Sequence, residues 1–273
     1  MNERRVSTDH AVGTKSEHEG NRSSQELAVL LEELAANSWP PRESRRLGTW
    51  RLRANEGVTT RANSVLAAGP FPSPDWIKTV ESFYREQGLP PYFHVGPSAP
   101  SGLDKQLEVA GYEVSMNCLM LAAPCQEVQR NARVNARRNV VTVPNAEGWW
   151  LDAFLRMEGF DESRRPGYVS IFSNMPSPRV FAAITEEGEQ LGLATAVIER
   201  GWAGISNVIV DPRYRRKGVA IRLLHALAAW SAEAGADSMY LQVMADNKAA
   251  LELYGKLGFS TVTSYHYRVR GRI

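Results

Sequence analysis

One stretch of the chain, residues 208–220, constrains the fold more than any other. It reads Val-Ile-Val-Asp-Pro-Arg-Tyr-Arg-Arg-Lys-Gly-Val-Ala: a β-branched run, an Asp-Pro break, a basic loop and one glycine. Beyond Gly218, apolar residues recur at helical spacing through Ala228. The stretch therefore predicts a strand, a turn and a helix that begins at the glycine. The first N–H groups of such a helix lack intrahelical partners and its dipole is positive there, so this end fits a phosphate.

The basic loop also matches a short pattern. Arg215-x-x-Gly218-x-Ala220 resembles the coenzyme A pyrophosphate loop, Gln/Arg-x-x-Gly-x-Gly/Ala, of the GNAT superfamily of N-acetyltransferases. Read alone, these six residues also fit a basic turn before a surface helix, or a nucleic-acid patch.

A second segment, residues 247–259, strengthens the resemblance. It reads Asn-Lys-Ala-Ala-Leu-Glu-Leu-Tyr-Gly-Lys-Leu-Gly-Phe. Asn247 is expected to cap a helix over 249–257 that stops at Gly258, after a strand predicted over 238–243. The segment is similar to the second GNAT signature, and the two signatures lie at the separation that the family uses. The resemblance covers residues 128–273.

The resemblance implies an α/β fold with a mixed, twisted β-sheet flanked by helices. It also implies an acetyl-CoA-dependent enzyme that transfers an acetyl group to a primary amine by direct attack on the thioester. The backbone of residues 208–210 would pair with the pantetheine arm, Asn247 would hold the arm or a water, and the basic loop would wrap the pyrophosphate. The cofactor-binding residues implied in this way are Val208, Ile209, Val210, Arg215, Arg216, Lys217, Gly218, Val219, Ala220, Ile221 and Asn247.

The chemistry needs a proton donor for the departing thiolate and a base for the amine. A tyrosine hydroxyl, with a pKa of about 10, can protonate a thiolate whose acid has a pKa near 8.5. By resemblance Tyr254 is this acid; the alternative is a tyrosine that packs in the core. The base is unresolved: Glu199 is one candidate, although it fits a turn equally well, and Ser206 or Asn207 could instead hold a water.

A row of carboxylates could attract a cationic amine or form an exposed helix face. It comprises Asp152, Glu158, Asp161 and Glu162.

A short segment of the first half of the chain resembles one in the second half. Residues 107–112 and 254–259 both predict a helix that stops at glycine and resumes as a strand with an aromatic residue. We therefore expect two tandem halves: a disordered polar tail over 1–24, a degenerate GNAT-like half over 25–125 without the basic loop, and a GNAT domain over 126–273. Residues 57–65, Gly-Val-Thr-Thr-Arg-Ala-Asn-Ser-Val, resemble part of some bacterial two-part GNAT proteins.

Composition is typical of a soluble cytoplasmic enzyme. The 273 residues are 43% hydrophobic with a net charge of +2, the two cysteines are too few for a disulfide scaffold, and five scattered histidines predict no metal. No apolar run is long enough to span a membrane. The near-neutral charge disfavours nucleic-acid binding through the linker arginines 130, 133, 137 and 138. A non-catalytic acyl-CoA-binding regulator remains the main alternative; the acceptor, a small molecule or a peptide, and the oligomeric state are open.

Overall fold

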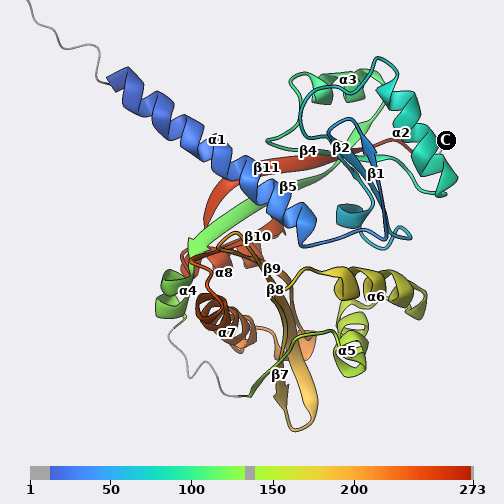
Figure 1. The fold of residues 1–273 in the computed structure, drawn as a ribbon. Coiled ribbons are helices and arrows are strands. Elements are labelled where there is room, and N and C mark those ends of the chain that lie inside the picture. The colour runs from blue at the N-terminus through green and yellow to red at the C-terminus, as the bar shows by residue number, and fades with distance from the viewer. Residues whose placement is uncertain (1–12, 133–138, 272–273) are drawn as a thin grey trace, which may run out of the picture.

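The computed structural model describes residues 13–132 and 139–271, which contain one mixed sheet of eleven strands (Figure 1). The strands are β1 (Glu43–Leu47), β2 (Trp50–Ala54), β3 (Val65–Leu66), β4 (Tyr92–Val95), β5 (Glu113–Pro124), β6 (Val140–Val143), β7 (Arg179–Glu186), β8 (Glu189–Glu199), β9 (Trp202–Val210), β10 (Ser238–Met244) and β11 (Ser260–Val269). The α-helices are α1 (Gly13–Asn37), α2 (Trp76–Glu86), α3 (Leu103–Val109), α4 (Cys125–Asn131), α5 (Gly148–Glu158), α6 (Arg165–Asn174), α7 (Val219–Glu233) and α8 (Lys248–Lys256). Short 3₁₀ turns are η1 (Thr60–Ala62), η2 (Glu162–Arg164) and η3 (Pro212–Tyr214).

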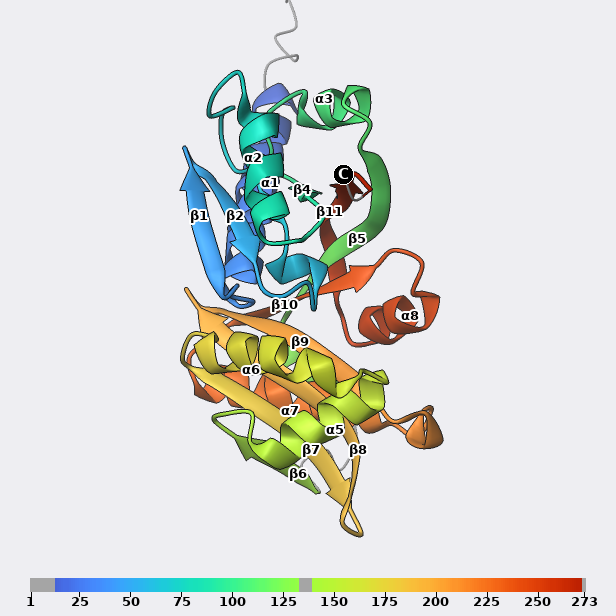
Figure 2. The same ribbon diagram turned by 90° about the vertical axis from the view of Figure 1, so that its right-hand side faces the viewer.

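The two halves of the chain exchange their last strands. The sheet order is β1-β2-β3-β4-β11-β5-β10-β9-β8-β7-β6. In the first half, β3 and β4 form a parallel pair, and β4 also pairs with the antiparallel strand β11 from the second half. In the second half, β9 and β10 form a parallel pair, and β10 also pairs with the antiparallel strand β5 from the first half. The exchanged strands β5 and β11 pair with each other in the middle and run side by side in Figure 2. A boundary at residue 125 therefore divides the chain but not the sheet, because β11 lies among first-half strands.

Helices cover both faces of the second-half strands. In Figure 1, α7 lies on one side of β7–β9, and α5 and α6 lie on the other. A close approach at Gly192 of β8 positions the start of α7, because a Cβ there would lie 2.7 Å from Val219 Cγ1 and 2.7 Å from the Ile209 carbonyl oxygen. No helix of the described residues is long and apolar enough to cross a membrane.

The N-terminal helix differs from the prediction. The sequence predicts a disordered tail over 1–24, but α1 begins at Gly13; residues 1–12 lie outside the described part. The packed part of α1 buries Leu31 and Leu34 against Met120 and Tyr240. Adding turns to an existing helix costs little, so the polar residues before it extend the helix without any apolar periodicity.

Candidate active site

Strands β9 and β10 separate part of the way along their length. Their parallel pairing covers only Trp202–Ile205 with Ser238–Leu241. A bulge in β9 lies where the pairing stops: the register with β8 shifts, and Asn207 has a positive φ of 53°, which asparagine tolerates better than most residues. Side chains hold the bulge, since Asn207 Nδ2 donates to Thr195 Oγ1 (3.0 Å) and the Ser206 hydroxyl lies 2.6 Å from the same oxygen. One edge of β9 is thus left unpaired beyond Ile205.

A cavity of about 420 Å³ lies at this separation. Of the residues predicted to be catalytic or to bind the cofactor, Val208, Ile209, Asn247 and Tyr254 line it. Ser206 and Asn207, which were considered as holders of a water, line it as well. Val210 is not among the lining residues; it pairs with Gly192 of β8, and its carbonyl oxygen accepts from Arg215 Nε (3.4 Å). The structure therefore gathers residues from both motifs at one place.

Tyr254 combines packing with access to the cavity. It is 7% exposed, and its ring centroid lies 5.7 Å from that of Phe259. No hydrogen bond joins its hydroxyl to another described residue, and burial raises the pKa of this hydroxyl to about 12. Tyr254 is therefore protonated at neutral pH. A role as general acid stays a prediction that this position permits.

Asn247 acts as the predicted helix cap. Its Oδ1 accepts from the Ala250 N–H (3.2 Å) at the start of α8, so the capping prediction is confirmed. The amide nitrogen makes no hydrogen bond to a described residue, which leaves two donors at the cavity wall.

The basic loop has the predicted shape. Gly218, at φ 78°, precedes α7 as its N-cap, and Arg216 also has a positive φ of 61°. Among the described residues, no backbone hydrogen bond uses an N–H of residues 215–221 as donor. Arg215, Arg216 and Lys217 are exposed, and the first turn of α7 holds no acidic residue. The loop thus offers free N–H groups and positive charge to an anion.

Glu199, one candidate for the base, does not line the cavity. Glu199 pairs with Trp202 at the β8–β9 turn, whereas the bulge lies opposite Thr195, about 13 Å further along β8 at the usual strand rise. Its carboxylate accepts from Asn37 Nδ2 of α1 (3.1 Å) and lies 3.6 Å from Arg200 Nη2. It serves the contact with α1 rather than the cavity.

The cavity also contains residues that the sequence did not assign to it. They include Thr59, Thr60 and Arg61 from the first half, Met116 and Cys118 of β5, Tyr265 and Tyr267 of β11, and Gln242 and Met244 of β10. Two features of the sequence pointed to this cavity. The first is the segment 57–65, which contains Thr59, Thr60 and Arg61; the second is the row of carboxylates, which includes Glu158, a lining residue.

Glu158 is the carboxylate of this cavity. Although the residue as a whole is exposed, partial desolvation at the cavity wall raises the pKa of its carboxyl group, and the positive charge of Arg61 opposes the rise. The other predicted carboxylates are engaged elsewhere: Asp152 and Glu162 both pair with Arg165, and Asp161 caps η2.

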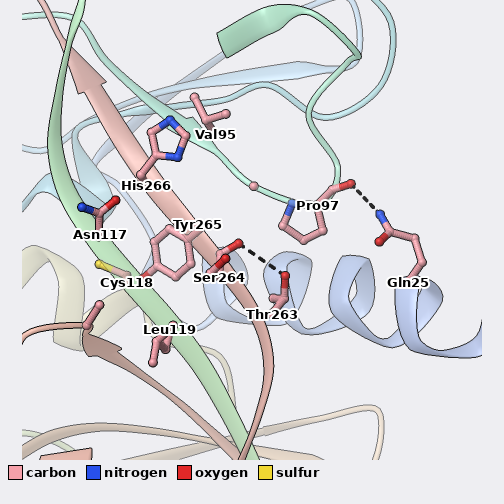
Figure 3. A pocket seen from close by; sticks show the side chains of 12 residues that line it. Gln25, Val95, Pro97, Asn117, Cys118, Leu119, Thr263, Ser264, Tyr265 and His266 are labelled. Carbon is pink, nitrogen blue, oxygen red and sulfur yellow. Dashed lines mark hydrogen bonds between the residues drawn. The ribbon is translucent and has the colours of Figure 1, made fainter. Parts of the chain in front are cut away.

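A second cavity of about 370 Å³ adjoins the first and shares Cys118 and Tyr265 with it (Figure 3). Gln25 of α1 borders it and donates to the Pro97 carbonyl oxygen (3.0 Å). In the described part of the chain, no three His, Cys, Asp or Glu side chains gather to hold a metal. Of the four linker arginines, residues 133, 137 and 138 lie outside the described part.

Several known proteins that are similar to this chain in sequence are described as acetyltransferases. The model of a family described as "Probable histone acetyltransferase Rv0428c C-terminal" matches residues 29–270. The chain is 37% identical over 240 residues to the "Uncharacterized N-acetyltransferase YobR" of Bacillus subtilis, covering 88% of this chain and 97% of that protein. The ribosomal protein bS18-alanine N-acetyltransferase of Escherichia coli is 33% identical over 92 residues, which are 33% of this chain and 62% of that one.

Solved structures share the fold. A GCN5-related N-acetyltransferase from Kribbella flavida has a TM-score of 0.63 at 17% identity, covering 92% of this chain and 96% of that one. A tandem GNAT protein from the clavulanic acid biosynthesis pathway has a TM-score of 0.55 at 12% identity, covering 72% and 70%. The mixed sheet, the flanking helices and the two-half architecture are thus those of GNAT proteins.

Proposed function

As this chain belongs to the family described as "Probable histone acetyltransferase Rv0428c C-terminal" and is a GNAT acyltransferase, we propose that it transfers an acetyl group from acetyl-CoA to a primary amine by direct attack on the thioester. The observation that carries the proposal is the position of Tyr254: it lines the cavity where β9 and β10 separate, on the same helix that Asn247 caps.

The chain's own groups fit acetyl-CoA. The free N–H groups of residues 215–221, together with Arg215, Arg216 and Lys217, would hold the pyrophosphate. The unpaired edge of β9 at Val208 and Ile209 would pair with the amides of the pantetheine arm, and Asn247 offers further donors. When bound, acetyl-CoA supplies the activated acetyl group.

The cavity then provides two opposite proton-transfer roles. Glu158 accepts a proton from the ammonium group of the acceptor, directly or through a water, because its raised pKa makes it a better base than an ordinary glutamate. Tyr254 donates a proton to the departing sulfur, since its pKa of about 12 keeps it protonated. A free N–H of β9 near the bulge would stabilise negative charge on the carbonyl oxygen.

The test is a thiol-release screen with acetyl-CoA against amines, amino acids, aminoglycoside antibiotics and peptide N-termini. Calorimetry with coenzyme A runs beside it. We expect coenzyme A binding and amine-dependent release of thiol. Binding without release with any acceptor would favour the non-catalytic acyl-CoA-binding regulator instead.

The cellular setting belongs to the same proposal. We propose a cytoplasmic enzyme, which is consistent with Cys118 and Cys125 being free thiols. Its acceptor is an amine on a small molecule or a peptide.

A further inference from the structure

Arg61 brings an unneutralised positive charge into the cavity from the first half of the chain. The lining residues include one cation, Arg61, and one carboxylate, Glu158. Arg61 is half-buried and forms no ion pair with a described residue; its guanidinium lies 3.9 Å from the centroid of the Trp39 ring. Burial raises the pKa of Glu158, Tyr265 and Cys118, and the positive charge of Arg61 opposes each of these rises, so its field extends across the cavity.

The loop that carries Arg61 is held rigidly. The Asn63 side chain accepts from the N–H groups of Asn55 (2.6 Å) and Gly57 (3.1 Å) and donates to the Thr59 carbonyl oxygen (2.7 Å). Although residues 62–67 have the composition of a strand, these bonds fix a turn there, and the segment contains the end of η1 and only the two-residue strand β3. A guanidinium in a fixed position loses less freedom when it binds an anion.

The same loop is fastened to the second half. Asn55 Nδ2 donates to the Gly167 carbonyl oxygen of α6 (2.9 Å), and the Tyr168 hydroxyl donates to the Val58 carbonyl oxygen (3.3 Å). A Cβ on Gly167 would lie 2.6 Å from Val58 Cγ1, so the contact is close-packed. Figure 2 shows the first half placed over β9 and β10. Arg61 therefore has a defined position relative to Glu158 and Tyr254.

The proposed cofactor does not account for this charge. The pantetheine arm and the acetyl group are neutral, and the phosphate-binding loop follows the outer end of β9, beyond Val210. Arg61 presents its positive charge to the cavity without a counter-ion among the described residues, and an anionic group on the acceptor would pair with it through charge-assisted hydrogen bonds. Building on the proposed function, we propose that the acceptor is a small amine that also carries an anionic group, with its amine at Glu158 and its anion at Arg61.

Two matched pairs of acceptors test this proposal. One pair is an α-amino acid and its carboxamide; the other is glucosamine 6-phosphate and glucosamine. We expect kcat/KM to favour the charged member of at least one pair by about 10-fold or more, because charged hydrogen bonds contribute strongly. The pair that shows the preference tells whether the anion is a carboxylate or a phosphate.

Substitutions then assign the preference to Arg61. Arg61→Gln should lower the charged-to-neutral ratio of kcat/KM roughly 10- to 100-fold. Arg61→Lys, which keeps the charge, should retain most of the ratio. The matched control is Arg85→Gln on α2, an exposed arginine outside the cavity, which should leave the ratio unchanged. Coenzyme A affinity and melting temperature show that each variant is folded.

The outcomes separate this inference from the proposed function. Turnover that favours neutral or cationic amines, with a ratio insensitive to Arg61→Gln, would overturn the inference and leave the acetyltransferase in place. If no acceptor in the panel turns over, binding tests the inference instead. The amino acid or glucosamine 6-phosphate should raise the melting temperature of the coenzyme A-saturated protein, and Arg61→Gln should remove this rise. The absence of that shift also overturns the inference.

Discussion

The two halves of this molecule share a connectivity but differ in what they can bind. The first half runs β3–α2–β4–α3–β5, and the second runs β9–α7–β10–α8–β11. The second half enters α7 through Gly218 and a loop of basic residues with free N–H groups. The first half enters α2 through a proline-rich segment over 70–74, with Asp75 at the N-cap.

Side chains fill the corresponding space in the first half. Phe71 and Trp76 pack against Trp50 with centroid distances of 5.8 and 5.1 Å. The negative charge of Asp75 also opposes anion binding at the start of α2. The comparison teaches that the order of strands and helices sets the architecture, while one loop decides whether a helix start can hold a phosphate.

The strongest way to break the comparison is to separate the halves. A fragment of residues 126–273 lacks β5, the strand between β10 and β11, and therefore exposes two unpaired edges and apolar surface. We expect it to aggregate or to be inactive when expressed alone, as measured by gel filtration and thiol release. Co-expression with residues 1–125 is the control and should restore solubility. A soluble, fully active fragment would show that the exchanged strand is dispensable.

The second prediction concerns glycines before helices in the two halves. Gly218 and Gly102 both precede a helix with a positive φ, 78° and 83° respectively. Proline cannot adopt this conformation, so either substitution distorts its turn. Gly218→Pro should abolish coenzyme A binding in calorimetry, whereas Gly102→Pro should lower the melting temperature and retain binding. Equal coenzyme A affinities in the two variants would remove the basis for placing the pyrophosphate at α7.

A third prediction compares the two glutamates considered as bases. Glu158→Gln should lower kcat roughly 10²-fold, as for loss of a general base, and Glu199→Gln should change it little. A base acts when deprotonated, so the raised pKa of Glu158 places the acidic limb of the rate profile above the pH of an ordinary glutamate. That limb should disappear in Glu158→Gln. A limb that persists unchanged would assign the base to another group.

The smallest predicted effect concerns how β11 is held in the first half. Arg268 of β11 pairs with Asp104 of α3 (2.6 Å), which together with His266 lowers the pKa of Asp104 to about 2. A pKa below the unfolded value gives stability that is present above about pH 4 and is lost as the pH falls towards 2. Because Asp104 is partly exposed, Asp104→Asn should lower the free energy of unfolding by about 1 kcal/mol or less at pH 7. Urea unfolding at pH 7 and pH 2 checks this; an equal loss at both values would point to packing instead.

The sequence could predict what depends on nearby residues. The turn at Gly218, the cap at Asn247 and the helices on either side follow from local patterns, and the resemblance between residues 107–112 and 254–259 correctly marked α3–β5 and α8–β11 as corresponding units. The strand exchange could not be predicted from local patterns, because it depends on pairing between residues about 150 positions apart. Glu199 looked suitable only because its position along β8 relative to the bulge was unknown.

The first-half contribution to the cavity was missed for a similar reason. Residues 62–67 have the composition of a strand, but the Asn63 side chain fixes a turn instead. This turn brings Arg61 to a cavity formed mainly by strands of the second half and the exchanged strands. The segment 57–65 was noticeable in the sequence, yet nothing local indicated which surface it would meet. The polar edge strand β1 was also missed, since its middle residues are exposed and give no alternation.

The most direct test of the account is Tyr254→Phe, which keeps the ring against Phe259 and removes the hydroxyl group that would donate the proton. When residues 107–112 are aligned with 254–259, Leu107 of the first half corresponds to Tyr254, so the first half has no hydroxyl group at this position. We expect kcat to fall roughly 10²- to 10⁴-fold, with coenzyme A affinity and melting temperature little changed. Because the pKa of Tyr254 is about 12, the wild-type rate should show no loss of this proton below about pH 10. Near-normal turnover with a lower melting temperature would contradict the account and leave Tyr254 as a packing residue.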